Sequence, residues 1–522
     1  MPEEFDYIVV GAGSSGCVVA ARLSADPAMR VLLVEAGPGT RHPWIMIPGA
    51  VSKVISPGKF NWGYMSEPEP GMANRPIYWP RGRGLGGSSA INGMVYLRGH
   101  AQDYDHWRQL GNTGWSWDDV VPLFHRAEET IHVSPAASQY NFSQLFLDAA
   151  HDQGFPIAEN LNSDQPAFHD CVGLLNFSIR NGLRRSTYEA YVAPVKGRRN
   201  LTIVTDALVE KVNIANGRAT GITYSKDGWR HVADVRGEVI LSGGAVNSPQ
   251  LLMLSGVGPG EHLRGHGIDV VADRAGVGQN LHDHANMPMI YNAPARYSIN
   301  HRVQGVRLGL EVARYLLTRT GVLAVGTSQG GLWATVTEGV EQPDVQIACR
   351  PFSFVFTPAG IGVSKSPTIT LSVYPARPES RGAITLRSDK ITDAPVIFAN
   401  YLQSPVDQAT IVKGARLAER IMSGPRMGGF SPETPIPQDD DALLDLIRAT
   451  ATPVYHPVGT CRMGADMQSV VDERLRVRGI DGLRVADASI MPAIVSANIN
   501  AACIMIGEKA SDLIAQDRRA GA

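Results

Sequence analysis

Cysteine is scarce in this sequence, with five residues in 522, and no two of them form a Cys-x-x-Cys pair. The five are scattered along the chain, at Cys17, Cys171, Cys349, Cys461 and Cys503. Their number and spacing argue against a disulfide framework and against a cysteine-ligated zinc site. The pattern fits a reducing compartment, so we expect five free thiols.

An excess of charge of one sign is also missing. Lysine and arginine total 48, and aspartate and glutamate total 50, which gives a formal net charge of −2. Proteins that bind nucleic acid usually carry a basic excess, so we expect no nucleic-acid partner. With 44% hydrophobic and 19% charged residues, the composition is that of a globular protein with an ample core.

Long hydrophobic runs are absent as well. No apolar run approaches the ~18 residues that a membrane-spanning helix needs, so we predict no integral membrane segment. The first residues, Met-Pro-Glu-Glu-Phe-Asp, are acidic and lead directly into a predicted strand, unlike a signal peptide. We therefore expect a cytoplasmic protein and leave peripheral membrane association open.

Clusters of metal ligands are rare in the sequence. The closest approach to one is His282-Asp283-His284, where two histidines flank an acid. These two histidines could form a metal pair, but no third ligand is evident nearby. We therefore favour a structural role for both and predict no metal site.

A strand, a glycine turn and a helix open the chain. The apolar run at residues 7–10 leads into Gly11-Ala12-Gly13-Ser14-Ser15-Gly16, and a helical pattern follows. In such a unit the glycines permit a tight turn, close approach of the backbone to a pyrophosphate, and close packing of the helix on the strand. The helix N-terminus offers free N–H groups to the phosphates. The next apolar run, 31–34, ends on Glu35, whose carboxylate can accept hydrogen bonds from an adenosine ribose. The unit predicts a dinucleotide site but does not choose between NAD and FAD.

A second glycine-rich segment follows a long stretch without helix or strand periodicity. Residues 40–80 are rich in proline, glycine and tryptophan, and we interpret them as an ordered segment that covers a ligand. Residues 81–93 hold five glycines, which would let backbone N–H groups approach an anion or a flat ring. Arg81 and Arg83 could add charge near a phosphate.

The remaining pattern divides the chain further. Helices are predicted at 104–130 and 140–153, and α/β character returns over 201–246, with a second strand–glycine turn–helix unit beginning at 238. The dinucleotide domain is therefore predicted to be discontinuous. Residues 286–450 alternate like strands with one buried face and add two helices, which predicts a sheet with helices on one side. Asp487 ends a short strand, where open α/β sheets place their ligands.

These motifs resemble the glucose–methanol–choline (GMC) oxidoreductases, FAD-dependent enzymes that oxidise alcohols, and in particular their choline-dehydrogenase-like and alcohol-dehydrogenase branch. The anchors are the first glycine turn with Glu35, the segment 81–93, the segment 243–258, His456-Pro457 and Asn498-Ile499-Asn500. The resemblance implies an α/β fold with a Rossmann-type FAD-binding domain and a substrate domain built on an antiparallel sheet flanked by helices. We assign 1–285 mainly to the FAD-binding domain, with a flavin-covering loop at 40–93 and a helical insertion at 104–195. Residues 286–450 form the substrate domain, and 451–522 return to the FAD-binding domain.

The resemblance also implies site residues. His456 and Asn500 match the catalytic pair of the family, and Ile91 stands where some relatives link FAD covalently through histidine, so we expect non-covalent FAD. The implied cofactor-binding residues are Gly11, Gly13, Ser14, Ser15, Gly16, Glu35, Ala36, Trp62, Arg81, Gly84, Gly87, Ser88, Asn92, Gly93, Met94, Val209, Asp487, Ala488 and Asn500.

The expected chemistry is oxidation of a primary alcohol to the aldehyde, with a hydride passing to flavin N5 and a proton to His456. Histidine suits the role of base because its unperturbed pKa is near ~6.5. The electron acceptor, oxygen or a quinone, stays open. So do two alternative functions, a choline dehydrogenase or oxidase and a hydroxynitrile lyase. A quaternary ammonium calls for an aromatic cage and a carboxylate, for which Trp62 and Glu311 are weak candidates. We therefore rank a neutral aliphatic or aromatic alcohol above choline.

Overall fold

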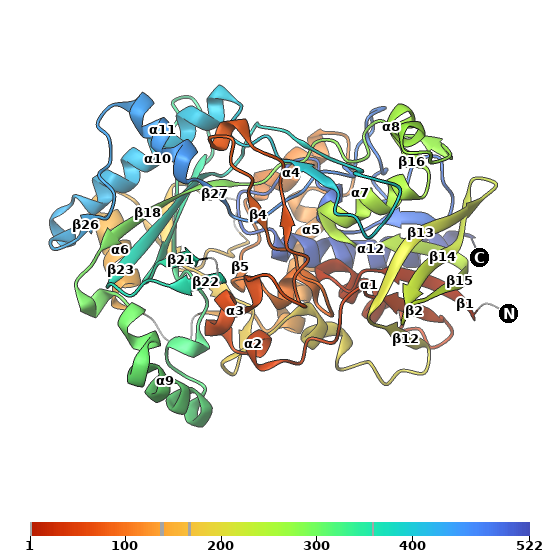
Figure 1. Ribbon diagram of the computed structural model, residues 1–522, viewed down its shortest axis with the longest axis horizontal. Coiled ribbons are helices and arrows are strands. Elements are labelled where there is room, and N and C mark those ends of the chain that lie inside the picture. The colour runs from red at the N-terminus through yellow and green to blue at the C-terminus, as the bar shows by residue number, and fades with distance from the viewer. Residues whose placement is uncertain (1–2, 136–139, 165–168, 358–359, 522) are drawn as a thin grey trace.

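The computed structural model describes residues 3–135, 140–164, 169–357 and 360–521. Its elements gather around two sheets that lie at opposite ends of the elongated molecule (Figure 1). Both chain ends lie beside the first sheet. The second sheet is built mainly from the middle of the chain. This division confirms the predicted α/β fold.

The first sheet has a parallel core and an antiparallel edge. Its strands are β12 (Leu201–Val204), β2 (Val31–Val34), β1 (Glu3–Val10), β15 (Trp229–Leu241), β14 (Arg218–Lys226) and β13 (Ala207–Ala215), in that order, with β28 (Leu483–Val485) beside β15. The strands β12, β2, β1 and β28 and the second half of β15 are parallel to one another. All four residues of β2 are buried, as expected for a parallel strand covered on both faces.

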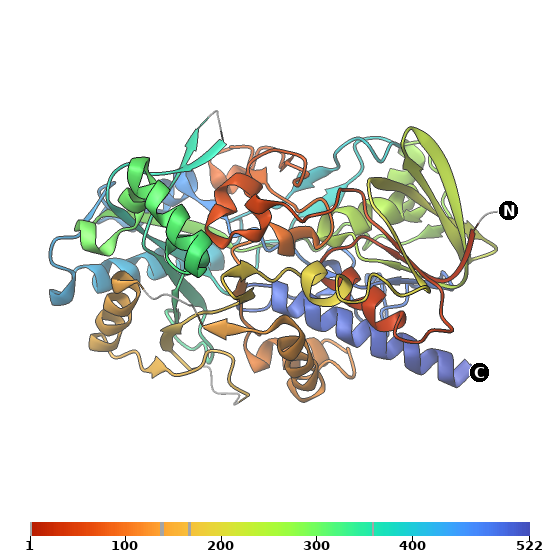
Figure 2. The same cartoon turned by 90° about the horizontal axis from the view of Figure 1, so that it is seen from below.

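Two helices pack together on this sheet. The helix α1 (Ser14–Leu23) follows the first glycine turn, and the C-terminal helix α12 (Asn500–Gly521) packs along it (Figure 2). The turn requires glycine at Gly16, because a Cβ there would lie 2.0 Å from the carbonyl oxygen of Gly11. The sequence rule for the third glycine of this motif therefore has a direct steric cause in this chain.

The second sheet is almost entirely antiparallel. Its strands, in order, are β26 (Ser431–Pro432), β18 (Ala285–Asn292), β23 (Thr368–Pro375), β20 (Val345–Arg350), β19 (Gly330–Ala334), β8 (Cys171–Leu174) and β7 (Ile157–Ala158), with β27 (Thr452–Pro453) on β18. Only β7 and β8 pair in parallel. The helices α6 (Asn141–Asp152), α10 (Pro405–Met422) and α11 (Asp440–Thr450) pack against this sheet.

The stretch 104–195 contributes to both halves. It begins with α4 (Ala101–Gln109) and α5 (Trp117–Ile131), which are separated by a turn containing Gly111 and Gly114, so the predicted helix 104–130 is two helices. The same stretch supplies α6, β7 and β8 to the second sheet. These strands have two and four residues, too few for an alternating pattern to reveal them in the sequence.

The stretch 40–80 has short regular elements where the sequence shows no period. It contains α2 (Pro43–Met46), α3 (Val51–Ile55) and the strand pair β3 (Tyr64–Met65) and β4 (Tyr78–Trp79). Each is too short to produce a recognisable hydrophobic repeat. Within the described residues, no helix combines the length and the apolar character needed to cross a bilayer.

Candidate functional site

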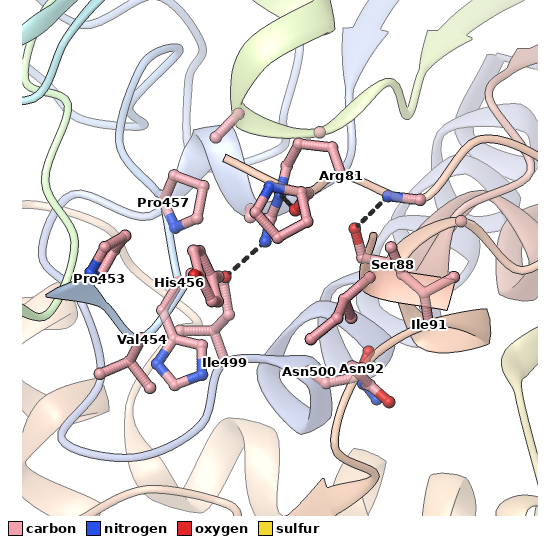
Figure 3. A pocket seen from close by; sticks show the side chains of 18 of the residues that line it. Arg81, Ser88, Ile91, Asn92, Pro453, Val454, His456, Pro457, Ile499 and Asn500 are labelled. Carbon is pink, nitrogen blue, oxygen red and sulfur yellow. Dashed lines mark hydrogen bonds between the residues drawn. The ribbon is translucent and has the colours of Figure 1, made fainter. Parts of the chain in front are cut away.

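A cavity of about 810 Å³ lies between the two sheets (Figure 3). Its walls come from the ends of β1, β2 and β15, from the glycine-rich segments, from one face of the second sheet and from the loops before α12. Of the predicted cofactor-binding residues, all except Gly16 and Gly84 line this cavity. The structure therefore brings together residues that the sequence spreads over almost 500 positions.

Glu35 holds three loops together at one end of the cavity. One carboxylate oxygen accepts a hydrogen bond from the N–H of Ala12 at 2.9 Å. The other accepts from the N–H groups of Gly37 at 2.8 Å and Gly84 at 2.9 Å. Burial raises the pKa of this carboxyl group, and the three N–H donors oppose that shift. Gly84, although it does not line the cavity, thus fixes the position of the carboxylate that does.

The first glycine turn and the segment 81–93 form adjoining parts of the wall. A Cβ on Gly87 would lie 2.7 Å from Cα of Gly13, so the two glycine loops touch through their backbones. The helix α1 begins at Ser14 without a side-chain cap, and Ser14 and Ser15 line the cavity. Helix N-terminal N–H groups without a side-chain cap are suited to a pyrophosphate. The backbone here fits the dinucleotide that the motif predicts.

Arg81 connects the glycine-rich segment to the loop that carries His456. Its guanidinium donates a hydrogen bond to the carbonyl oxygen of Tyr455 at 2.7 Å (Figure 3). Burial lowers the pKa of Arg81, which lines the cavity near the predicted catalytic residues. The contact found is with backbone, whereas the sequence suggested charge near a phosphate. Arg83 donates to the carbonyl of Ala36 at 3.2 Å.

Asp283 and the residues beside it fix the backbone of His456. The N–H of His456 donates to Oδ1 of Asp283 at 2.7 Å, and the Tyr401 hydroxyl donates to Oδ2 at 2.8 Å. His282 and Val458 form a bridge in which each N–H donates to the other's carbonyl. Burial raises the pKa of Asp283 to about 6. The short loop around His456 is thereby anchored on both sides of the imidazole.

The imidazole of His456 contacts two side chains. Its Nδ1 lies 3.1 Å from Nδ1 of His284, and its Nε2 lies 3.1 Å from the amide nitrogen of Asn498. His284 places its own Nε2 3.0 Å from the carbonyl oxygen of Ala376. A carbonyl only accepts hydrogen bonds, so Nε2 of a neutral His284 carries the hydrogen and its Nδ1 is an acceptor. His456 must then donate from Nδ1, which leaves the lone pair on Nε2 facing Asn498.

Burial keeps both histidines neutral. It lowers the pKa of His284 to about 4 and the pKa of His456 well below 6.5, and the neighbouring His284 and Arg81 lower the latter further. A neutral imidazole whose Nε2 carries a lone pair, here facing the amide nitrogen of Asn498, is a proton acceptor. The cavity therefore contains one histidine in the state that general-base catalysis requires.

The side chain that contacts His456 is not Asn500, the residue predicted to act with it. Asn498 contacts the imidazole, whereas Asn500 begins α12 and its Oδ1 accepts a hydrogen bond from the Ser14 hydroxyl at 2.7 Å. Both asparagines line the cavity. They are two residues apart in an irregular segment, where no helix or strand period decides which side chain faces the imidazole. The motif Asn498-Ile499-Asn500 contains the asparagine that contacts His456, and its spacing does not identify which of the two that is.

Asp283, His284 and Asn498 are thus site residues that sequence reasoning missed. The available signal for Asn498 is the Asn498-Ile499-Asn500 motif, and the signal for Asp283 and His284 is the His282-Asp283-His284 motif, which we interpret as structural. That reading fits His282, whose two ring nitrogens contact the carbonyl of Asn280 at 2.7 Å and the N–H of Ile494 at 2.9 Å. In the part of the chain that the structure describes, no group of three or more His, Cys, Asp or Glu residues is placed to hold a metal ion.

Comparison with known proteins agrees with this geometry. Family models described as GMC oxidoreductase match residues 5–286 and 378–507. The chain is 40% identical to mitochondrial choline dehydrogenase of Mus musculus, over 98% of this chain and 89% of that protein. It is 37% identical to oxygen-dependent choline dehydrogenase of Brucella canis, over 98% and 95%.

Solved structures resemble the whole molecule. Pyridoxine 4-oxidase from Mesorbium loti has a TM-score of 0.86 at 28% identity, covering 97% of this chain and 98% of that one. A formate oxidase has a TM-score of 0.92 at 26% identity, covering 99% of both chains. The glycine loops, the uncapped start of α1 and the Glu35 carboxylate fit FAD in the cavity. This chain belongs to the GMC oxidoreductase family and is an FAD-dependent oxidoreductase that acts on CH–OH groups.

Proposed function

We propose that this enzyme oxidises a primary alcohol to the aldehyde, with His456 as the general base and Asn498 as its partner. The observation that carries the proposal is the hydrogen-bond series from Ala376 through His284 to His456 and Asn498. It leaves the acceptor Nε2 and the amide donor of Asn498 side by side at the cavity wall. A hydroxyl group is both donor and acceptor, so one alcohol can bond to both.

Each residue then has a defined task. When bound, FAD supplies the acceptor for a hydride from the alcohol carbon. Asn498 donates to the alcohol oxygen and holds it, and Nε2 of His456 takes the hydroxyl proton. His284 keeps the proton of His456 on Nδ1. Asp283 holds the backbone of His456, so the imidazole keeps its position while it is protonated. The product is an aldehyde, and the acceptor that reoxidises FAD is oxygen or a quinone.

The cavity favours a substrate other than a quaternary ammonium, although the relatives above are named for choline. Among the described residues, the carboxylates lining the cavity are Glu35 and Asp487, and both accept several hydrogen bonds from protein groups. Trp62, the candidate cage wall, has the guanidinium of Arg83 5.2 Å from its ring centre and stacks on Tyr64 at 5.8 Å. The Trp62 ring therefore already contacts the Arg83 guanidinium and the Tyr64 ring, which disfavours its use as the wall of an ammonium cage. We therefore rank other alcohols above choline.

The location we propose is the cytoplasm, because all five cysteines are buried free thiols. The FAD we propose to be non-covalent, because Ile91 offers no nucleophile at the wall where it lies.

The decisive experiment mixes the oxidised enzyme with a panel of primary alcohols in the absence of oxygen. We expect loss of the visible flavin absorbance with at least one alcohol, and formation of one equivalent of aldehyde. Admission of air or addition of a quinone then identifies the acceptor that restores the colour. A panel that never reduces the flavin, or a cyanohydrin that is cleaved without any change in flavin colour, would contradict the proposed oxidation.

A further inference from the structure

Three strands of the second sheet present alternate residues to the cavity. These are Pro288 and Ile290 on β18, Ala348 and Arg350 on β20, and Ser372 and Tyr374 on β23. Because side chains alternate across a sheet, all six lie on one face. Arg350 is the charged residue of this wall. The ring of Tyr374 lies 5.2 Å from that of His284, so the wall continues to the catalytic histidines.

The guanidinium of Arg350 is poorly satisfied by the protein. It donates one hydrogen bond, from Nη2 to the Ser372 hydroxyl at 2.6 Å, and lies 5.7 Å from the ring centre of Phe354. Its Nε is buried without a hydrogen-bond partner. No described carboxylate forms an ion pair with it. Burial lowers its pKa to about 10, so it is still a cation at neutral pH.

Two other arginines of this chain that are buried form ion pairs with carboxylates. Arg98, whose side chain is 4% exposed, pairs with Glu128 and Asp164. Arg484, at 1% exposed, pairs with Glu238 and Asp517. Burying a charge without a counter-charge costs free energy, and in Arg98 and Arg484 the paired carboxylates offset that cost. Arg184, at 1% exposed, has no carboxylate partner but donates to the carbonyl oxygens of Ile45, Ser89 and Asn92. Arg350 has neither kind of partner beyond its one bond to Ser372, and it lines the cavity.

We propose that Arg350 binds a carboxylate of the substrate, so that the alcohol oxidised here is a hydroxy acid. The inference rests on the proposed alcohol oxidation and names its substrate class. A carboxylate accepts two parallel hydrogen bonds from a guanidinium, which would satisfy the donors that the protein leaves open. A single cation in an otherwise neutral wall matches a singly charged group. The same cation repels a quaternary ammonium, which is a second reason to rank choline low.

The test compares ligands that differ only in charge. Benzoate and benzamide, and their reactive counterparts 4-(hydroxymethyl)benzoate and 4-(hydroxymethyl)benzamide, would be titrated into the FAD-loaded enzyme, together with aliphatic acid and amide pairs. Binding of the unreactive pairs is followed by the change in flavin absorbance and needs no turnover. A hydrogen bond to a charged group contributes about 1.5–3 kcal/mol, so the acid of the best pair should bind about tenfold to a hundredfold more tightly than its amide.

Variants locate the effect. Arg350→Met should abolish the preference for the acid, and Arg350→Lys should keep part of it. Arg236→Met, on an exposed arginine that pairs with Asp6 far from the cavity, should retain the full preference. Equal binding of acid and amide to the wild-type enzyme in every pair, or a preference that survives Arg350→Met, would overturn the proposal. If Arg350→Met does not fold, the wild-type comparison decides. Tight acid binding without flavin reduction by any alcohol would instead reject the proposed oxidation.

A second feature lies outside the cavity. The helix α9 (Gly305–Thr318) projects from the second half of the molecule (Figures 1 and 2), and Tyr315 is its one buried residue. Its outward face is apolar: Val306 is 84% exposed, Leu310 66%, Leu316 62% and Leu317 85%. Exposed apolar clusters of this kind mark interaction surfaces.

The charge around α9 indicates what covers this face. Residues 295–320 contain five arginines and one acid, Glu311, and no lysine or aspartate, a net charge of 5 − 1 = +4 in a chain of −2. Glu311 is paired with Arg302 at 2.5 Å, while Arg307 and Arg314 are exposed on the helix. A dimer formed through α9 would bring two segments of net charge +4 together, and their repulsion disfavours it. An apolar face flanked by arginine matches an anionic lipid surface.

We infer that α9 docks the enzyme on anionic membranes. The full-length holoenzyme should sediment with vesicles that contain phosphatidylglycerol, and far less with phosphatidylcholine alone or in high salt. Leu310→Ser with Leu317→Ser should abolish sedimentation, whereas Trp229→Ser, on an exposed tryptophan of β15, should retain it. Failure to bind either vesicle, or a mass that doubles with concentration and returns to the monomer in the double variant, would overturn the inference.

Discussion

Replacing His456 by alanine tests the mechanism most directly. General-base catalysis is typically worth about 10²–10⁴ in rate, so His456→Ala should slow anaerobic flavin reduction by about that factor while FAD stays bound. The assay is stopped-flow mixing with a saturating alcohol, in which only the reductive half of the reaction is observed. Among the described residues, the imidazole hydrogen-bonds to the side chains of His284 and Asn498 and to none of the glycine turn, so the change should leave the cofactor cradle intact.

The two asparagines supply a matched comparison. Asn498 donates to the alcohol oxygen as its negative charge develops, and such a bond contributes about 1.5–3 kcal/mol, so Asn498→Ala should slow reduction about tenfold to a hundredfold. Asn500 bonds instead to the Ser14 hydroxyl at the start of α1. Asn500→Ala should therefore change the reduction rate by only a few fold and weaken the retention of FAD. If Asn500→Ala slows flavin reduction as much as His456→Ala does, Asn500 rather than Asn498 is the catalytic partner.

The pH dependence has a defined sign. The base works only when neutral, and burial lowers the pKa of His456 well below 6.5. The wild-type reduction rate should consequently stay level as the pH falls to about 6.5 and decline only in more acidic solution. His456→Ala should lack this acid limb. If His456→Ala reduces its flavin at a rate within about threefold of wild type, and that rate still declines in acidic solution, His456 is not part of the mechanism.

Three further results are expected from the cofactor site and the thiols. Acid denaturation should release all of the yellow colour into the supernatant, because Ile91 cannot form a covalent link; flavin retained by the washed precipitate would refute this. Glu35→Lys should purify mostly as apoprotein, because the change removes the acceptor of three backbone N–H groups as well as the predicted ribose contact; full flavin content would exclude that role. All five cysteines should react with a thiol reagent after denaturation without reductant, and slowly before it, because burial raises the pKa of each thiol; three or fewer would indicate a disulfide.

The parts of the fold that were predictable are those whose sequence pattern has a local physical cause. The first strand, the glycine turn and Glu35 follow from the steric needs of one βαβ unit, and the structure confirms them together. The strands β20 and β23 are long enough to be recognised from the sequence, but the prediction of a single buried face was wrong, because residues on both faces of each strand are buried. In contrast, β8 joins the sheet by pairing with β19, more than 150 positions away, and β7 joins it by pairing with β8, so no local sequence pattern predicts either strand.

The site shows the same limit at the level of single side chains. His456 could be named from its motif, but the side chain that bonds to its imidazole depends on how the segment before α12 bends, and that side chain is Asn498 rather than Asn500. The role of His284 arises only when the loop at 280–284 pairs with the loop at 456–458. Arg350 carries no signal in the sequence that separates it from other arginines, because its lack of an ion-pair partner is a product of the tertiary structure.

The face of the second sheet that lines the cavity has an evolutionary consequence. The inward residues of β18, β20 and β23 line the cavity, while their immediate neighbours point to the other side, where α10 packs. Neighbouring residues of one strand are therefore subject to different selection: one for binding of the substrate, and the next for the stability of the fold. A lineage can exchange Arg350 or Ser372 without disturbing the packing beneath. The likeness of this fold to pyridoxine 4-oxidase and to a formate oxidase at below 30% identity is expected where new substrates arise by point changes on a conserved scaffold.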